Sequence, residues 1–359
     1  DEAGMARTDD LAKLTAAVSA AQAKLVLVGD PYQLGAVGPG GMFRTLVDQY
    51  GARELETVRR FAEDWEASAS LRLRARDATV LSTYRNHGRI EDGSRDEMLD
   101  RAHRVWRAAR EEGKSVVVTA NDNETADELA RRCRADRVRR GEVEEEGVRF
   151  TSGVASRNDE VVTLRNDRRL RLDSGEFVRN GARWKVLDAR VDGSLVVEPL
   201  VGHGRVVLPR EYVREHLGLA YALTVHKAQG LTVDRSYALV DQRMTAAQFY
   251  VAMSRGRETN VALVCSSDDA FEDHARRPLV EAITLLEGVM YRDDVDRSAH
   301  EVMRAGLERV ELGTHPEDEG ELATRRVGHS PRIESDLDHF DFFEPPPDMP
   351  RQEGPVLRP

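Results

Sequence analysis

The sequence contains only two cysteines, Cys133 and Cys265, and nothing in their spacing suggests a metal site. This scarcity excludes a disulfide-stabilised secreted scaffold, and two reduced thiols fit a cytoplasmic protein. No stretch approaches the roughly 18 consecutive apolar residues of a membrane-spanning helix, so no membrane insertion is expected. Aromatic residues make up only 6% of the chain, but 40% of it is hydrophobic, enough for a sizeable core.

The chain also lacks an excess of positive charge, because its formal net charge is −11. The excess of negative charge comes from the C-terminal part of the sequence. From Ser266 onward there are 23 acidic and 11 basic side chains, and before it there are 41 acidic and 42 basic ones. A body that is close to neutral can bind phosphate where its basic groups face one groove. The acidic total therefore does not exclude a nucleic-acid partner.

Short apolar runs alternate with amphipathic stretches along most of the chain. Buried strands are expected at 24–30, 115–120, 236–240 and 260–266. Helices are expected at 11–23, 61–77, 96–114, 123–140 and 245–255. Strands that alternate with helices predict an α/β layered fold with a parallel sheet.

Residues 148–213 break this rhythm, since their apolar residues come in short alternating runs. Asn180-Gly181 and Asp192-Gly193 are turn signals between these runs. The pattern predicts a small antiparallel barrel or meander inserted into the α/β domain. Residues 269–311 are expected to form a helical extension. The acidic, proline-rich residues 312–359 are expected to be a disordered tail.

Two carboxylates, Asp1 and Glu2, precede the stretch KLVLVGDPYQL, which contains Asp30 and Gln33. Enzymes that hydrolyse nucleotide phosphates place such an acidic pair beside Mg²⁺. The Asp holds the metal through its water shell and the Glu polarises the attacking water. If the strand ending at Gly-Asp lies beside the pair, Gln33 can reach a γ-phosphate or its water. Either stretch alone is weak evidence for this chemistry.

The stretch YALTVHKAQG offers several hydrogen-bond donors to phosphate oxygens. Its candidate residues are Thr224, His226, Lys227, Gln229 and Gly230. They follow an apolar run, so they are expected at the end of a strand.

Two arginines, Arg255 and Arg257, follow the expected helix at 245–255 and precede a buried strand. An arginine at such a place can reach a transferring phosphoryl group, although it can also simply complement the helix dipole. Trp184, in the alternating segment, is either a platform on which DNA bases stack or a core residue of a small sheet.

The order of these stretches resembles the motif series of superfamily 1 DNA helicases of the RecD-like branch. Within that branch it is similar to the helicase half of MobF-type conjugative relaxases, the TraA/TrwC kind. DEAGM resembles motif II, LVGDPYQLGAVGPGGMF motif III and VRRFAEDWEASASLRLR the motif IV region, with Arg60 at its arginine. ALTVHKAQG resembles motif V and YVAMSRGR motif VI. The resemblance covers roughly residues 1 to 268.

The resemblance implies RecA-like P-loop NTPase lobes, with parallel sheets covered by helices on both faces. Residues 1–85 correspond to the remainder of a first lobe and the motif IV region. Residues 86–147 and 214–268 correspond to the second lobe. The inserted segment 148–213 corresponds to an SH3-like β-barrel subdomain.

The implied activity is ATP-driven 5′–3′ translocation along single-stranded DNA, with unwinding of the duplex. The implied catalytic residues are Asp1, Glu2, Gln33, Arg60 and Arg255, with Asp1 and Glu2 serving Mg²⁺. Nucleotide contacts are implied for Asp30, Gln229, Gly230 and Arg257. Contacts with DNA are implied for Thr224, His226 and Lys227, and are hypothesised for Trp184.

The sequence contains no G-x-x-x-x-G-K-[ST] phosphate loop. GAVGPGGM is rich in glycine but lacks the lysine. The expectation is therefore a chain that begins at motif II and does not hydrolyse ATP alone. Three explanations are open: a fragment of a relaxase helicase, one piece of a split gene completed by an N-terminal relaxase or phosphate-loop fragment, or a non-catalytic DNA-binding or protein-interaction remnant.

Overall fold

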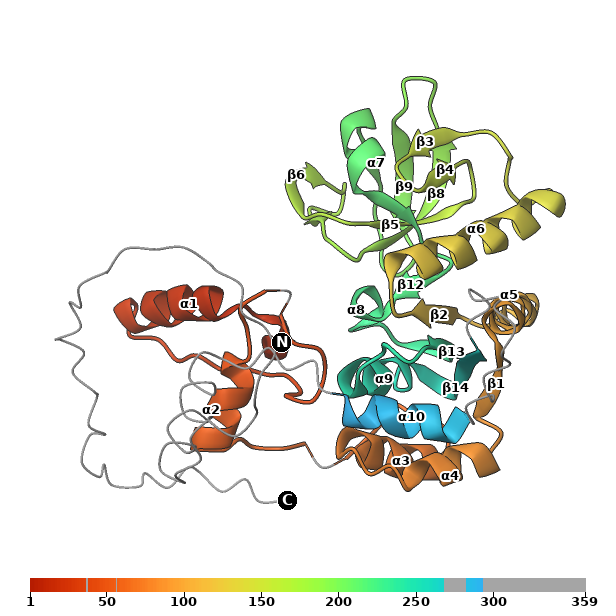
Figure 1. Ribbon diagram of the computed structural model, residues 1–359. Helices are drawn as coiled ribbons and strands as arrows, with labels where there is room; N and C mark the ends of the chain where they lie inside the picture. Colours follow the sequence, from red (N-terminus) through yellow and green to blue (C-terminus); the bar gives the residue numbers. More distant parts are fainter. Residues whose placement is uncertain (37, 56, 268–281, 293–359) are drawn as a thin grey trace, which may run out of the picture. The chain divides into compact units, whose positions relative to one another are not determined.

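The computed structural model describes residues 1–36, 38–55, 57–267 and 282–292 (Figure 1). The longer described helices are α1 (Thr8–Ala20), α2 (Met42–Tyr50), α3 (Asp64–Arg74), α5 (Arg95–Glu111), α6 (Asn123–Arg139) and α10 (Ala282–Tyr291). The shorter ones are the 3-10 turn η1 (Ala3–Met5), α4 (Val80–Asn86), α7 (Arg210–His216), α8 (Val225–Ala228) and α9 (Ala246–Ala252).

A five-stranded parallel sheet forms the centre of the α/β part. Its strands are β1 (Ile90–Ser94), β2 (Val116–Ala120), β12 (Leu223–Thr224), β13 (Val233–Val240) and β14 (Gly256–Ser267). They lie in the order β1-β14-β13-β2-β12, and every neighbouring pair is parallel. The runs read as strands at 115–120, 236–240 and 260–266 therefore do pair in one parallel sheet, as their near-continuous apolar character indicates.

Helices cover both faces of this sheet because successive strand residues point to opposite sides. Tyr237 and Leu239 of β13 pack in one buried cluster with α5 and α6. Ala238 and Val240, between and beyond them, pack in another cluster with α3, α4, α9 and α10. Figure 1 shows these helices around β13 and β14. The α/β class with a parallel sheet is confirmed.

The helices begin where the sequence supplies capping residues. Ser94 and Glu97 form a capping box at the start of α5, and Thr245 and Gln248 form another at α9. Asp122 accepts a hydrogen bond from the backbone N–H of Thr125 at the start of α6. These caps fix where each helix leaves its strand, and hence where the loops at the edge of the sheet lie.

Antiparallel strands occupy most of residues 148–219. The main sheet has the order β10-β9-β8-β5-β11, and two further pairs are β3-β4 and β6-β7. The bounds are β3 (Val148–Phe150), β4 (Gly153–Ala155), β5 (Glu160–Thr163), β6 (Asp167–Arg171), β7 (Phe177–Val178), β8 (Arg183–Ala189), β9 (Leu195–Pro199), β10 (Val206–Leu208) and β11 (Leu217–Leu219). Gly181 and Gly193 have φ of 79° and 85°, as the turn signals require.

The boundary predicted at residue 213 differs from the structure. Helix α7 starts at Arg210, inside the segment expected to be β-rich, and β11 extends the antiparallel sheet to Leu219. The polar sequence REYVREH forms a helix because Tyr212 and Val213 are buried while its charged residues face solvent.

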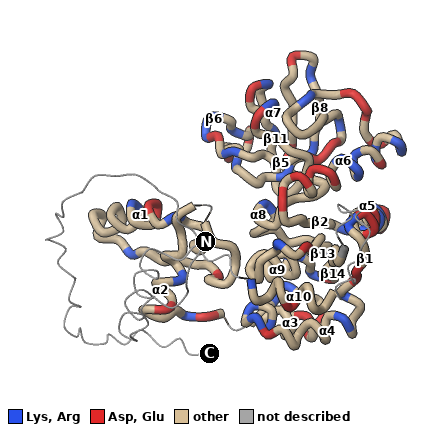
Figure 2. Tube along the Cα trace, in the orientation of Figure 1, with Lys and Arg blue, Asp and Glu red and all other residues tan. Residues whose placement is uncertain are grey.

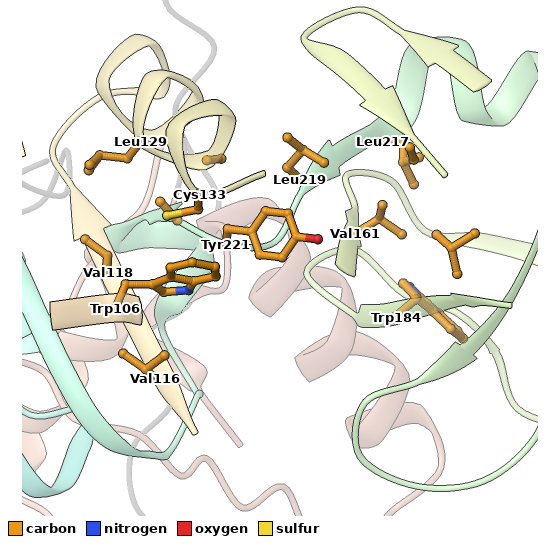
Figure 3. Close-up of a cluster of buried hydrophobic side chains, with 14 of the residues drawn as sticks. Trp106, Val116, Val118, Leu129, Cys133, Val161, Trp184, Leu217, Leu219 and Tyr221 are labelled. Carbon is orange, nitrogen blue, oxygen red and sulfur yellow. The ribbon is translucent and has the colours of Figure 1, made fainter. Parts of the chain in front are cut away.

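The antiparallel and parallel parts share one continuous core (Figure 3). Tyr221 lies between Trp106 of α5 and Val161 of β5. Its ring packs edge-on against the Trp106 ring, with 5.6 Å between the ring centres. Its hydroxyl donates to Asp159 Oδ1 at 2.7 Å and accepts from Arg137 Nη1 of α6 at 2.8 Å. Asp159, which is fully buried, also accepts from Arg134 Nε at 3.0 Å. Charge-assisted bonds of this kind tie the β segment to α6.

The strand predicted at 24–30 is wrong. These residues form no strand, and Val26 and Val28 are 67% and 50% exposed. Their backbone hydrogen bond to another segment runs from the Ala3 N–H to the Val28 carbonyl, at 2.8 Å. A buried parallel strand needs ladder partners on its edges and cover on its faces. The described residues around 24–30 supply neither.

Within the predicted helical extension 269–311, the described residues contain α10, whose Leu286 and Val289 are fully buried. The predicted tail 312–359 lies outside the described residues. None of the helices in the described part is both long and apolar enough to cross a bilayer. Figure 2 shows that acidic and basic residues are interspersed along the described residues.

Candidate nucleotide site

Glu2 and Gln229 meet although 227 positions separate them in the sequence. The Gln229 side-chain amide donates from Nε2 to Glu2 Oε2 at 2.9 Å. Glu2 has a φ of 54°, in the left-handed region, and its N–H bonds to the Asp1 carboxylate at 3.0 Å. A Cβ added to Gly230 would lie 3.9 Å from Glu2 Oε1, so this backbone also passes close to the carboxylate.

Asp30 joins three segments of the chain. Its carboxylate accepts hydrogen bonds from Gln33 Nε2 at 3.3 Å, from Arg74 Nε of α3 at 3.1 Å and from the Tyr250 hydroxyl of α9 at 3.0 Å. Burial is the main reason that the pKa of Tyr250 is raised, so this hydroxyl keeps its proton and donates. The guanidinium of Arg74 also lies over the ring of Tyr32, 4.6 Å from its centre.

Arg74 and Tyr250 are site residues that the sequence analysis missed. Tyr250 precedes Arg255 by a little more than one helical turn within YVAMSRGR, so its place beside the arginine was available from the sequence. Arg74 is the last residue of the stretch that resembles the motif IV region, but the resemblance singled out only Arg60 there.

Arg255 is almost completely buried, with 1% of its surface exposed. Its guanidinium donates to the Val251 carbonyl at 2.8 Å and to Ser254 Oγ at 2.9 Å. The pKa of Arg255 is lowered to about 10, mainly by burial and also by the nearby charge of Arg60, while Glu2 opposes both effects. Among the described residues, no carboxylate lies within ion-pair distance of Arg255.

Arg60 is half-buried and approaches the same turn from the motif IV region. Its Nη1 donates to the Ser254 carbonyl at 2.5 Å. Burial is the main cause of its lowered pKa, the charge of Glu2 opposes this, and the charge of Arg257 adds to it. The structure therefore brings together Glu2, Arg60 and Arg255, three of the residues singled out from the sequence.

Two buried amide oxygens at this site have no hydrogen-bond partner, Gln33 Oε1 and Gln229 Oε1. Unpaired buried polar atoms are uncommon in folded proteins. The two desolvated guanidinium groups supply positive charge near the carboxylates of Glu2 and Asp30. A polyanion such as a triphosphate fits the guanidinium groups, whereas the two amide oxygens only accept and fit a donor such as water.

The described residues contain no cluster of three or more His, Cys, Asp or Glu side chains that could hold a metal ion by themselves. Asp1 is exposed and Glu2 is half-buried. Mg²⁺ is commonly held by one or two carboxylates together with substrate phosphates. Asp1 and Glu2 fit that pattern, in which the phosphates complete the coordination.

The residues of motif V surround α8, a four-residue helix that leads from the end of β12 to Gln229. Thr224 is buried and caps α8, accepting from the Lys227 N–H at 3.4 Å. Lys227 Nζ donates to Asn123 Oδ1 at 2.8 Å, and burial lowers the pKa of this lysine. His226 is half-buried beside it. Thr224 therefore acts within the structure as a helix cap.

Trp184 does not fit the proposed base-stacking role. It is 2% exposed, and its indole N–H donates to Thr163 Oγ1 at 3.1 Å inside the β segment (Figure 3). An alternating strand places each aromatic residue on one face or the other, and Trp184 is on the inner one. The side chain of Arg257 is exposed, and its Nη1 lies 3.6 Å from Asp234 Oδ1. Arg257 is also close enough to Arg60 to lower its pKa.

A family model described as an AAA domain matches residues 1–95. The probable conjugal transfer protein TraA of Sinorhizobium fredii is 34% identical over 264 residues, and TraA of Agrobacterium fabrum is 35% identical over 263 residues. The chain is homologous to part of TraA. The alignments cover 72% of the chain but only 23% of each TraA protein.

A solved structure described as the Pif1 helicase from Bacteroides in complex with ADP-AlF3 and ssDNA is also similar. It matches with a TM-score of 0.48 and 17% identity, over 87% of this chain and 75% of that one.

Proposed function

We propose that the chain is part of an ATP-driven DNA translocase, the 5′–3′ helicase portion of a TraA-type conjugative relaxase. The support is the homology to TraA together with the order of motifs II to VI along the chain. In this proposal the parallel sheet with its helices is the second RecA-like lobe. Residues 1–85 hold the end of the first lobe and the motif IV region, and the β segment is an inserted SH3-like subdomain.

One observation carries the proposal: Arg60 and Arg255 are brought together, desolvated and without a carboxylate at ion-pair distance, beside Glu2. Two such cations repel each other and cost free energy unless an anion joins them. Charge that develops on a transferring phosphoryl group is the kind that arginine stabilises. The energetic cost of this arrangement is thus explained by an anionic reaction centre.

ATP with Mg²⁺ would supply the phosphoryl group and the metal. The chain's own residues then bind, orient and polarise. Asp1 contributes a metal-side carboxylate, and Glu2, held by Gln229, accepts a proton from the attacking water. Gln33 is held by Asp30 so that its amide can sense the γ-phosphate.

The remaining nucleotide-side and DNA-side roles rest on proximity. Gly230 has a φ of 79°, which favours glycine, and turns the backbone beside Glu2, while Arg257 adds positive charge at the rim of the site. Thr224, at the start of α8, and His226 and Lys227 within it are proposed to couple the site to the DNA backbone. Because α8 is only four residues long, a shift at Lys227 is transmitted over a short distance to Gln229.

The 359 residues contain no phosphate-loop motif, so we propose that the loop comes from another segment or polypeptide. The experiment joins a loop-bearing RecA-type segment to this chain and measures ATP hydrolysis with and without single-stranded DNA. The expected result is DNA-stimulated turnover by the joined protein and none by the chain alone. Nucleotide binding without DNA-stimulated turnover would contradict the proposal and favour a non-catalytic DNA-binding or protein-interaction role.

A further inference from the structure

Arg255 lies in a short turn, Ser254 to Gly256, between α9 and β14, and one buried side chain holds the backbone of this turn. Asn260 Oδ1 accepts from the Gly256 N–H at 2.7 Å, and Asn260 Nδ2 donates to the Gly256 carbonyl at 3.0 Å. Asn260 is fully buried. A single amide therefore fixes both backbone groups of the residue that follows Arg255.

Glu66 of α3 decides which way this amide points. Asn260 Nδ2 donates its second proton to Glu66 Oε1 at 3.0 Å, so both amide protons are used. If the amide were reversed, its oxygen would face two other oxygens, the Glu66 carboxylate and the Gly256 carbonyl. The orientation that holds the turn is thus the only one that satisfies all of these groups.

Position 256 has no room for a side chain. A Cβ added to Gly256 would lie 2.2 Å from the Thr259 carbonyl, far inside van der Waals contact, and 3.0 Å from Asn260 Oδ1, which is a tight contact. A second segment also holds the turn, since the Ala62 N–H donates to the Arg257 carbonyl at 2.7 Å.

Stability does not explain the presence of a carboxyl group at position 66. Glu66 is fully buried, Oε2 has no partner, and none of the ion pairs among the described residues includes it. Arg89 is near enough to favour the charged form but does not form an ion pair with Glu66. Burying a carboxyl that has no ion-pair partner costs free energy, and an apolar residue of the same size would avoid the cost. A buried polar group that costs stability is accounted for when it fixes a functional neighbour.

We propose that Glu66, acting through Asn260, is a positioning residue that holds the Ser254–Gly256 turn and so fixes where Arg255 lies. Helix α3 then has two roles at its two ends. Glu66, near its start, holds the arginine turn, and Arg74, at its end, bonds to Asp30. One rigid helix thereby sets the distance between the motif III loop and the motif VI arginine. The catalytic importance of this distance rests on the proposed function.

The test measures how well the turn shields Arg255, and it needs no ATP hydrolysis. The folded chain is treated with phenylglyoxal, which modifies exposed arginines, and mass spectrometry compares modification of Arg255 with that of Arg257. The first is 1% exposed, while the side chain of the second is 57% exposed. The wild-type ratio is expected to be low, and Arg257 serves as the reference within the same segment.

Three variants separate positioning from general packing. Asn260→Ala removes the amide and Glu66→Leu removes its acceptor, so each is expected to raise the ratio several-fold. Glu66→Gln keeps an acceptor oxygen and is expected to restore the wild-type ratio. Asn121→Ala, which removes a different side-chain bond at the same sheet, is the matched control.

Arg137, whose side chain is 10% exposed and which bonds to Tyr221, reports on the rest of the fold. The proposal is overturned if the ratio stays low in Asn260→Ala and Glu66→Leu. It is also overturned if Arg137 becomes reactive together with Arg255, because that shows general loosening. If Arg255 is displaced as expected but has no effect on hydrolysis in the joined protein, the positioning claim holds and the proposed function fails.

Discussion

Gln229 Nε2 donates a hydrogen bond to Glu2 Oε2 at 2.9 Å, and this bond connects the motif V loop with the acidic pair at the other end of the chain. It leaves the second oxygen of Glu2 available for a water molecule. It also leaves Gln229 Oε1 buried and unpaired, so the amide is held in place without being satisfied. A change at α8 can therefore alter the position of the glutamate.

Gln229→Ala is expected to lower kcat in a protein completed with a phosphate loop. Hydrogen bonds to charged groups contribute about 1.5–3 kcal/mol, so a loss of roughly ten- to a hundredfold is expected. The KM for ATP should change much less, because the bond orients a catalytic carboxylate. Steady-state ATPase assays check this, with the exposed Gln49→Ala as the control. A kcat within twofold of wild type would show that the bond has no part in turnover.

Glu66 should make the stability of the chain depend on pH. Burial is the main reason that its pKa is raised, while Asn260 and Arg89 oppose this and Glu63 adds to it. The folded state then holds a proton that the unfolded state has lost, so stability falls as pH rises from the ordinary carboxyl range through the raised pKa. Each unit of raised pKa corresponds to about 1.4 kcal/mol.

Urea unfolding of wild type and Glu66→Gln between acidic and neutral pH measures this effect. The variant should be the more stable protein at neutral pH, and the difference should disappear in acid. Glu146→Gln, at an exposed site between α6 and β3 that has no influence on Glu66, is the control. A stability difference that does not change with pH would mean that Glu66 titrates normally.

Trp184 should matter for stability and not for DNA. Trp184→Ala removes a buried indole and is expected to cost about 3–5 kcal/mol, while Trp184→Phe keeps most of the packing but leaves Thr163 Oγ1 without this donor. Chemical denaturation measures both variants. Binding of a fluorescent single-stranded oligonucleotide by Trp184→Phe should equal that of wild type, and a clear loss of affinity would restore the stacking role.

The sequence predicted the elements whose burial leaves a simple pattern. Strands β2, β13 and β14 are apolar runs, and α5 and α9 begin at recognisable caps. Strand β1 was not predicted, because its sequence, IEDGS, is polar and it pairs only at the edge of the sheet with β14. The run 24–30 is as apolar as a strand, but pairing depends on neighbours that a local pattern does not contain.

The candidate site shows the same limit. Motif order pointed to Glu2, Arg60 and Arg255, and the structure brings them together. Arg74 and Glu66 were missed because their contacts with Asp30 and Asn260 are distant in sequence. For Tyr250 the sequence indicated a place near Arg255, but not the hydrogen bond to Asp30. An aromatic residue in an alternating strand, such as Trp184, faces the core or the solvent with no local signal to tell which.

Arg255 provides the most direct test of the claim that this chain contributes the arginine of an ATP-hydrolysing site. The measurement is single-stranded-DNA-stimulated ATP turnover by the protein completed with a phosphate loop, for wild type and Arg255→Ala. Arg169→Ala, at an exposed ion pair in the β segment, is the control. An arginine that stabilises a transferring phosphoryl group contributes about 10³–10⁵ in rate, so turnover should fall by at least about a thousandfold while DNA binding is retained. Near wild-type turnover by Arg255→Ala would contradict the account.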